Sequence, residues 1–391
     1  MVAEGYKETE IGVIPEEWEV VKLKNILTIG SGKDYKYLDK GDIPVYGTGG
    51  FMLSVNKYLY DGESVCIGRK GTIDKPMFLT GKFWTVDTLF YTHLFKDIKP
   101  KFLYYLFLQI DWKKYNEASG VPSLSKKTIE VIQIPLPPLK EQEKIADILS
   151  TADEKIDAIA SQIQKAETLK KGLLQKLLSE GIGHSECEDS ELGKIPVNWE
   201  INDLEKATTY VDYRGKTPTK TKNGVFLITA RNIKGNKIDY SLSNEYIAEK
   251  DYETVMSRGK PQVGDVLLTT EAPLGQIASV DKEYVALAQR IIKYRGVENY
   301  LDNSFLKHYF ISSKFQDLLL LNSTGSTVKG IKGSRLKKLK IAIPPLEEQQ
   351  QIADILSTAD EKLEVLRAKK QMYETLKKGL LQKLLSGEVR V

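Results

Sequence analysis

Glycine, hydroxyl-bearing and basic residues gather in short loops that could contact nucleic acid. Residues 68–72 read GRKGT, and residues 323–327 read STGST. Such loops let backbone amides and short hydroxyls approach a phosphate or a base edge, while lysine and arginine neutralise charge. Residues 214–222 are basic, and residues 329–340 hold six bases and no acid. The pattern favours DNA contact, although any one of these loops could equally be an ordinary solvated surface.

We predict that DNA contacts come from both halves of the chain. A lysine acts mainly through phosphates, whereas an arginine can also read guanine. In the first half the predicted residues are Lys33, Tyr46, Thr48, Arg69, Lys70 and Thr72. In the second half they are Arg214, Lys216, Lys220, Arg231, Thr324, Ser326, Lys329 and Lys332.

Catalytic motifs are missing from the sequence. Residues 325–332 carry the two glycines of a phosphate-binding loop without its Lys-Ser/Thr, and residues 30–32 lack the third glycine of a dinucleotide fingerprint. Both Pro-Pro pairs are followed by leucine, so the Asp/Asn-Pro-Pro-Tyr/Phe segment of an amino-methyltransferase is absent. Three histidines lie far apart in the sequence. We therefore expect no active site, no metal site and no cofactor bound by this chain.

The composition indicates folded domains in a reducing compartment. The 391 residues are 41% hydrophobic, which suits roughly two to four structural units. Two cysteines cannot build a disulfide framework, and no stretch approaches the roughly 18 apolar residues of a membrane span. The charged start does not resemble a signal peptide. We expect a cytoplasmic protein without membrane contact. The net charge of +4 permits nucleic-acid binding without arguing for it.

An internal repeat organises the chain. Residues 137–155 (PPLKEQEKIADILSTADEK) and 344–362 (PPLEEQQQIADILSTADEK) are identical at sixteen of nineteen positions, at an offset of 207. The same offset relates residues 169–179 to 376–386, both LKKGLLQKLLS. An Ile-Pro-x-x-Trp segment at residues 14–18 returns at 195–199, at an offset of 181. The blocks between these repeats share little sequence, which favours two different tasks; a recent duplication followed by drift is the alternative.

The repeated tails have the pattern of long helices. From Ile145 and from Ile352 the apolar residues step by four and three, as in a coiled-coil seam, which predicts helices of about 40 residues and about 60 Å. The 16 residues from Glu180 to Ile195 reach roughly 50 Å at most, too short for a comfortable return. The helices should therefore be antiparallel.

These observations predict an α+β fold with a pseudo-twofold internal repeat. Two mixed α/β domains would lie at opposite ends of an antiparallel two-helix coiled coil. The expected boundaries are 1–136 for the first domain, 137–180 for the first helix, 181–343 for the second domain and 344–387 for the second helix.

The duplicated helices offer a stripe that could bind two copies of one partner. Apolar residues off the seam widen it beyond a two-helix contact, although packing against the chain's own domains would explain them equally well. The predicted partner-binding residues are Ile145, Ile148, Leu149, Ile352, Ile355 and Leu356.

The two tail motifs, each ending GLLQKLLS, and the openings EIGVIP and ELGKIP followed by tryptophan resemble the specificity subunit of type I restriction–modification systems. The resemblance implies a non-catalytic subunit whose two domains each read one half of a bipartite DNA sequence. It implies that the helices dock two modification (methyltransferase) subunits, to which two restriction subunits add. S-adenosylmethionine, ATP and Mg would be used by those partners. No base-contacting residue is carried over from the family.

Three other interpretations remain open. One is a coiled-coil scaffold whose end domains bind proteins or peptides. Another is an enzyme in its own right, such as a fused nuclease, which the missing motifs disfavour. The third is an orphan specificity subunit that has lost its partners.

Overall fold

The structure is a computed structural model that describes residues 3–214 and 218–391. It divides into two compact units: unit 1 comprises Met1–Ser161 with Arg367–Val391, and unit 2 comprises Gln162–Leu366. Two long helices, α3 (Leu139–Leu177) and α9 (Leu346–Leu385), each contribute one part of their length to each unit. Their 39 and 40 residues confirm the predicted helices.

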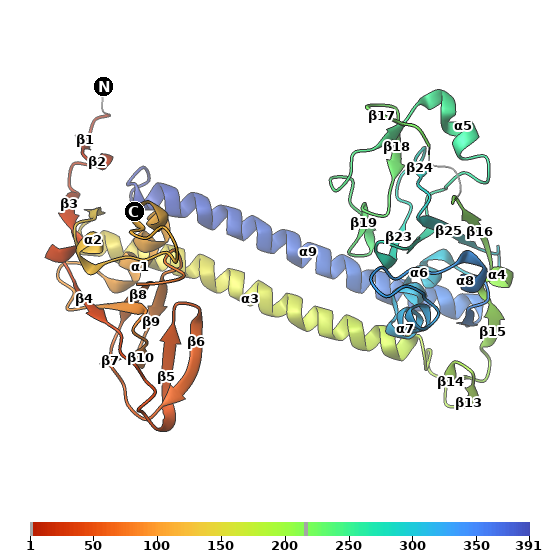
Figure 1. Cartoon of the computed structure of the whole chain (residues 1–391), viewed down its shortest axis with the longest axis horizontal. Helices are drawn as coiled ribbons and strands as arrows, with labels where there is room; N and C mark the ends of the chain where they lie inside the picture. Colours follow the sequence, from red (N-terminus) through yellow and green to blue (C-terminus); the bar gives the residue numbers. More distant parts are fainter. Residues whose placement is uncertain (1–2, 215–217) are drawn as a thin grey trace. The chain divides into compact units, whose positions relative to one another are not determined.

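Unit 1 places two four-stranded sheets next to a helical layer (Figure 1). One sheet has the order β4-β11-β8-β9, with strands Thr28–Ser31, Leu89–His93, Ser64–Gly68 and Met77–Leu79. The other has the order β6-β5-β10-β7, with strands Gly50–Val55, Lys40–Gly47, Lys82–Thr85 and Tyr60–Asp61. Smaller elements are the hairpin β1–β2 (Tyr6–Thr9, Gly12–Pro15), the pair β3–β12 (Glu19–Lys22, Gln133–Leu136), η1 (Leu23–Asn25), α1 (Pro100–Gln109), η2 (Trp112–Tyr115) and α2 (Lys126–Glu130).

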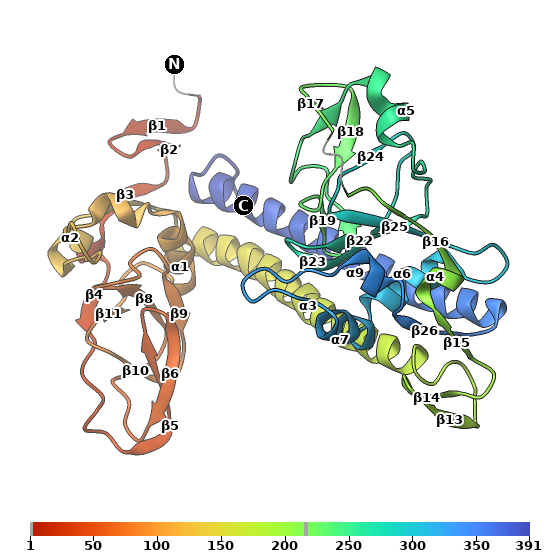
Figure 2. The same cartoon turned by 45° about the vertical axis from the view of Figure 1, so that its right-hand side comes forward.

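Unit 2 repeats this plan with larger loops. Its main sheet has the order β16-β25-β22-β23, with strands Thr208–Asp212, Ile291–Gly296, Val266–Thr270 and Leu274–Ser279. A second sheet has the order β17-β21-β18-β24, with strands Lys220–Thr221, Tyr246–Ile247, Val225–Ile228 and Ala286–Leu287. Figure 2 shows α5 (Tyr252–Val255) beside this second sheet, on the side away from α6 and α7.

The remaining elements of unit 2 include a hairpin and a strand pair like those of unit 1, together with additional short elements. They are the hairpin β13–β14 (Cys187–Ser190, Gly193–Pro196), the pair β15–β26 (Glu200–Asp203, Lys340–Ile343), α4 (Leu204–Ala207), β19–β20 (Ile233–Lys234, Lys237–Ile238), η3 (Glu249–Asp251), α6 (Asn303–Ile311), α7 (Ser313–Leu321) and α8 (Gly333–Leu336). The main sheets of the two blocks therefore share one strand order, although the second sheets differ in theirs and the sequences share little.

The long helices supply part of each core. In unit 1, Ile145 and Leu149 near the start of α3 share a core with Leu381 and Leu384 near the end of α9. In unit 2, Ile352 and Leu356 near the start of α9 share a core with Leu177 near the end of α3. Within each unit, the first turns of one helix thus pack in the same core as the last turns of the other. Burying such side chains contributes about 1.5–3 kcal/mol each.

The repeated Glu-Gln dipeptide explains why the opening and tail motifs recur together. The Trp18 indole donates to Glu141 Oε2 at 2.9 Å, and the Trp199 indole donates to Glu348 Oε2 at 3.1 Å. The neighbouring glutamines, Gln142 and Gln349, donate to the proline carbonyls just before each helix, at 2.8 and 2.7 Å. Each tail motif therefore ties its helix start to the opening motif of the same unit.

Candidate nucleic-acid interface

Two loops meet at one edge of the main sheet in each unit, and the same backbone contacts join them. In unit 1 the Leu124 amide donates to the Arg69 carbonyl at 2.9 Å, and Lys70 forms a β-bridge with Ser123. In unit 2 the Ile331 amide donates to the Thr270 carbonyl at 3.1 Å, and Glu271 forms a β-bridge with Gly330. We call residues 69–72 with 117–125, and residues 270–273 with 324–332, the paired loops.

Each paired loop is also bonded to the turn before β11 in unit 1 or before β25 in unit 2. The Arg69 amide donates to the Thr88 carbonyl at 2.7 Å, and the Thr270 amide donates to the Arg290 carbonyl at 2.9 Å. Gly68 permits the turn in unit 1, because a Cβ there would lie 2.0 Å from the Thr72 carbonyl oxygen. The loops are therefore rigidly framed by backbone bonds, while their side chains remain free to differ.

All six residues predicted in the first half lie around this frame. The Lys33 amide donates to the Thr85 carbonyl at 2.9 Å, and the Val86 amide donates to the Tyr46 carbonyl at 3.0 Å. Residues 85 and 86 lead directly into the turn that holds Arg69. A Cβ at Gly71 would lie 3.6 Å from the Thr48 hydroxyl, so Thr48 also faces the loop that carries Lys70 and Thr72.

An open cavity of about 860 Å³ adjoins the paired loops of unit 1. Arg69 and Lys70 line it and are exposed, and Arg69 donates to the Asp87 carbonyl at 3.4 Å. The rest of the lining mixes donors and acceptors: Ser31, Asp87, Thr88, Glu117, Ser123, Ser125 and Lys126 line it with the apolar Phe90, Ala118, Val121 and Leu124. Such a mixed surface suits base edges as well as phosphates.

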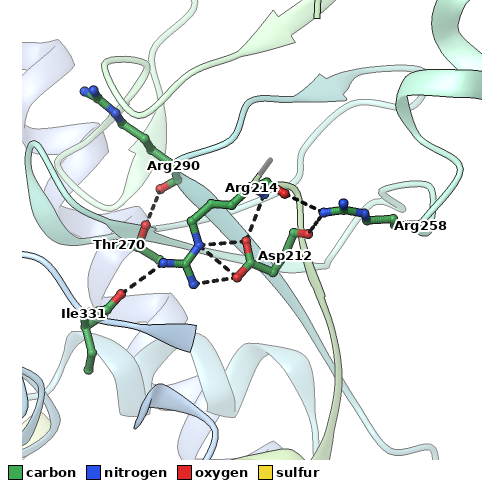
Figure 3. Close-up of polar contacts among 6 residues, drawn as sticks. All are labelled: Asp212, Arg214, Arg258, Thr270, Arg290 and Ile331. Atoms are coloured by element: carbon green, nitrogen blue, oxygen red, sulfur yellow. Dashed lines mark hydrogen bonds and ion pairs between the residues drawn. The ribbon is translucent and has the colours of Figure 1, made fainter. Parts of the chain in front are cut away.

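Arg214 makes a structural contact within unit 2. Its guanidinium forms hydrogen bonds of 2.6–3.0 Å to both carboxylate oxygens of Asp212 and reaches the Ile331 carbonyl at 3.4 Å (Figure 3). These bonds to Asp212 raise the pKa of Arg214 above its ordinary value. Arg258 reinforces the pair by donating to the carbonyls of both residues, at 2.8 and 2.7 Å. Reading a base with Arg214 would require breaking this arrangement, so our prediction for it is corrected to a role in holding the paired loop.

The other second-half residues fall into two places. Thr324, Ser326, Lys329 and Lys332 lie exposed on the paired loop of unit 2. Lys220 and Arg231 instead line a cavity of about 400 Å³ that Arg290 and the paired-loop residue Ala272 also line. Lys220 pairs there with Glu245 at 2.7 Å. Lys216 lies outside the described residues.

Several candidate residues were not predicted from the sequence. In unit 1 these are Thr88, Ser123, Ser125 and Lys126, which line the cavity, and in unit 2 they are Glu271 and Arg290. Extending the 207-residue offset upstream of the tails would have matched residues 117–125 to the loop 324–332. Nothing in the sequence marks Arg290 as lying opposite Glu271, because their contact depends on the sheet pairing.

The predicted partner stripe needs a correction. Ile145, Leu149, Ile352 and Leu356 are fully buried in the chain's own cores, so they cannot contact a partner directly. Ile148 is half-buried against the same core, and Ile355 is 40% exposed.

A different pair of apolar residues faces solvent at repeated positions. Leu169 is 63% exposed and Leu376 is 51% exposed. Three residues later, Gly172 and Gly379 lie within the last two turns of their helices, where a Cβ would meet nothing within 4 Å. A glycine inside a helix costs about 0.5–1 kcal/mol relative to alanine, and no packing within either unit requires it.

The described residues contain neither a group of three or more His, Cys, Asp or Glu side chains placed to hold a metal ion nor a helix long and apolar enough to cross a membrane.

Comparison with known proteins gives a consistent picture. The family model for the type I restriction modification DNA specificity domain matches residues 15–168 and again 196–374. The chain is 29% identical to the type I restriction enzyme MjaVIII specificity subunit of Methanocaldococcus jannaschii, covering 99% of this chain and 96% of that one. It is 26% identical to a putative specificity subunit of Haemophilus influenzae, over 81% and 80% of the two chains.

A solved structure supports the fold. The crystal structure of a type I restriction–modification S subunit from M. genitalium has a TM-score of 0.65 over 94% of this chain and 96% of that one, at 15% identity. Because the family model covers most of the sequence and matches it twice, the chain belongs to the type I restriction modification DNA specificity family.

Proposed function

We propose that this chain is the non-catalytic specificity subunit of a type I restriction–modification complex and reads a bipartite, asymmetric DNA target. The observation that carries the proposal is the duplicated frame. Each unit holds a paired loop through the same backbone bonds, yet the side chains on the two loops differ. One scaffold used twice with different surface chemistry is what a reader of two unlike half-sites requires.

The proposed DNA surface combines the paired loops with the residues that frame them. In unit 1 it comprises Arg69 and Lys70, which line the cavity, together with the frame and loop residues Lys33, Tyr46, Thr48 and Thr72. In unit 2 it comprises the loop residues Thr324, Ser326, Lys329 and Lys332, with Lys220 and Arg231 at the neighbouring cavity and Lys216 from the sequence pattern.

The proposed architecture places one target-recognition domain (1–136 and 181–343) at each end of antiparallel helical spacers (137–180 and 344–387). The shared cores support this arrangement, because the start of each helix packs with the end of the other within a unit. The spacers would set the distance between half-sites independently of either domain.

The helices would dock two methyltransferase subunits, through which two restriction subunits join. Sequence identity between residues 169–179 and 376–386 extends to exposed positions, which supports two equivalent sites for one partner. We assign Leu169 with Gly172, and Leu376 with Gly379, to these sites, because a glycine next to an exposed leucine lets another helix approach closely. Ile148 and Ile355 would lie at their margins. S-adenosylmethionine, ATP and Mg would belong to the partners, and the complex would act on cytoplasmic DNA.

Selection from a random duplex library tests the proposal. The chain is assembled with its methyltransferase, bound DNA is recovered, and the enriched sequence is read. We expect two short, different motifs separated by unspecified base pairs. A complex that assembles but enriches no sequence would contradict DNA reading and would favour a protein-interaction scaffold.

A further inference from the structure

The paired loops of the two units present opposite charges at equivalent positions. The backbone bonds that hold the loops match Arg69 to Thr270, Lys70 to Glu271, and Thr88 to Arg290. In unit 1 the loop position holds a lysine and the turn position holds a threonine. In unit 2, a carboxylate on the loop faces an arginine. The backbone amide and carbonyl contacts are the same in the two units. The two paired loops therefore differ in the chemistry of their side chains.

Glu271 and Arg290 form an ion pair of their own. Arg290 Nε lies 3.2 Å from Glu271 Oε1, and the two side chains are 50% and 47% exposed. Figure 3 shows the Arg290 guanidinium directed away from Arg214, while the Arg290 carbonyl accepts a hydrogen bond from the Thr270 hydroxyl. An exposed pair of this kind contributes little to stability, so its place on the frame calls for another role.

The chemistry of the pair matches one base pair in the major groove. A carboxylate accepts a hydrogen bond from the N4 amino group of cytosine, and an arginine donates to O6 and N7 of guanine. A G·C pair presents these groups side by side, in the same plane. In unit 1 the corresponding position offers only Lys70, with Arg69 before it, so that loop can donate to guanine without selecting the cytosine amino group.

We infer that positions 271 and 290 in unit 2, and their equivalents 70 and 88 in unit 1, determine base specificity, and that Glu271 with Arg290 reads one G·C pair of the second half-site. The inference rests on the proposed function, because it assigns bases within the target that the chain is proposed to read.

The test compares Glu271→Gln with the wild type, each assembled with the methyltransferase, by sequencing the methylated motif and measuring affinity for duplexes that differ at single positions. Glutamine prefers adenine through N6 and N7. We expect the preference for G·C at one position of the second half-site to fall about 5- to 150-fold and adenine to be accepted there. The first half-site should be unchanged.

Glu191→Gln is the matched control. Glu191 forms a similar exposed ion pair with Lys340, at 2.7 Å, outside the paired loops. The methylated motif of the Glu191→Gln complex should equal that of the wild type. A second variant, Arg290→Lys, should weaken the guanine preference at the same base pair, because lysine lacks the bidentate fork.

The outcomes separate the two claims. If wild type yields a bipartite motif but Glu271→Gln and Arg290→Lys both leave every position of the second half-site unchanged, the assignment of these residues is overturned. If the wild-type complex yields no bipartite motif at all, the proposed function fails, and the assignment, which rests on it, fails with it.

Discussion

Lys170 on α3 forms an ion pair with Asp360 on α9 inside unit 2. The equivalent ion pair recurs in unit 1, where Lys377 on α9 pairs with Asp153 on α3. Each residue lies 207 positions from its counterpart of the same type. The lysine side chains are only 11% and 19% exposed, so each unit carries the same largely buried ion pair between its two helical segments. The sequence repeat therefore gives each unit the same ion pair between its segments of α3 and α9.

Removing these lysines should destabilise the units. Lys170→Met leaves Asp360 beside an apolar group, and we expect a loss of about 1–3 kcal/mol in the free energy of unfolding. Lys377→Met should have a comparable effect. The measurement is a denaturation midpoint, with Lys370→Met as control, because Lys370 pairs with Glu374 along the surface of one helix and should change stability by less than about 0.5 kcal/mol. Equal effects at Lys170 and Lys370 would contradict a structural role for the buried pair.

The stability of unit 2 should fall at acidic pH because of His308. Burial lowers the pKa of His308 to about 4, from an ordinary value of 6.5, while Asp360 acts in the opposite direction. A lowered folded-state pKa means that the stabilising contribution is present above pH 6.5 and is lost as the pH falls from 6.5 toward 4, at up to about 1.4 kcal/mol per pH unit.

Replacing this histidine tests the effect. His308→Asn should flatten the pH dependence of the denaturation midpoint between pH 6.5 and 4, whatever its stability at pH 8. If the variant and the wild type lose stability in parallel across that range, protonation of His308 is not the cause.

Arg69 and Lys70 should contribute to DNA affinity, whereas Arg214 should contribute to folding. Alanine at Lys70 should weaken binding to all sequences and reduce the slope of log affinity against log salt by about 1. Alanine at Arg69 should relax one base position as well. Arg214→Ala should instead lower the denaturation midpoint, because it leaves Asp212 without its guanidinium. Unchanged affinity across salt in the Arg69→Ala, Lys70→Ala double variant would show that this loop does not face DNA.

The exposed leucines should control the number of bound methyltransferase subunits. Leu169→Asp and Leu376→Asp should each reduce the complex from two methyltransferase subunits to one, and the double variant should bind none tightly. Mass measurement of the assembled complex reads the stoichiometry. Val365→Asp is the control, because Val365 is 62% exposed on α9 but lies outside the repeated segment. Full occupancy in the double variant would place the partner elsewhere.

The sequence was informative where structure follows from periodicity. Steps of four and three from Ile145 predicted the long helices, because one face must be apolar to be buried. The same reasoning missed Lys170, which lies in the buried seam as the partner of Asp360. Residue type alone does not reveal a buried cation when its counter-charge lies on a helix about 190 residues away in the chain.

The candidate site was only partly predictable for a related reason. Glycine and basic residues pointed to the loop at Arg69, and the structure brings its predicted neighbours together around it. The shared frame of the two units remained hidden because it depends on backbone amides and carbonyls, which every sequence supplies. Arg214 was misjudged because its charge was counted without Asp212, two residues earlier, which neutralises it.

Methylome sequencing of cells that express this chain with its methyltransferase decides whether one duplicated frame reads two different half-sites. We expect a methylated motif of two unlike half-sites, separated by unspecified base pairs and centred about one helical turn, 10 to 10.5 base pairs, apart. A methylated motif that is continuous, or that is palindromic, would contradict this expectation.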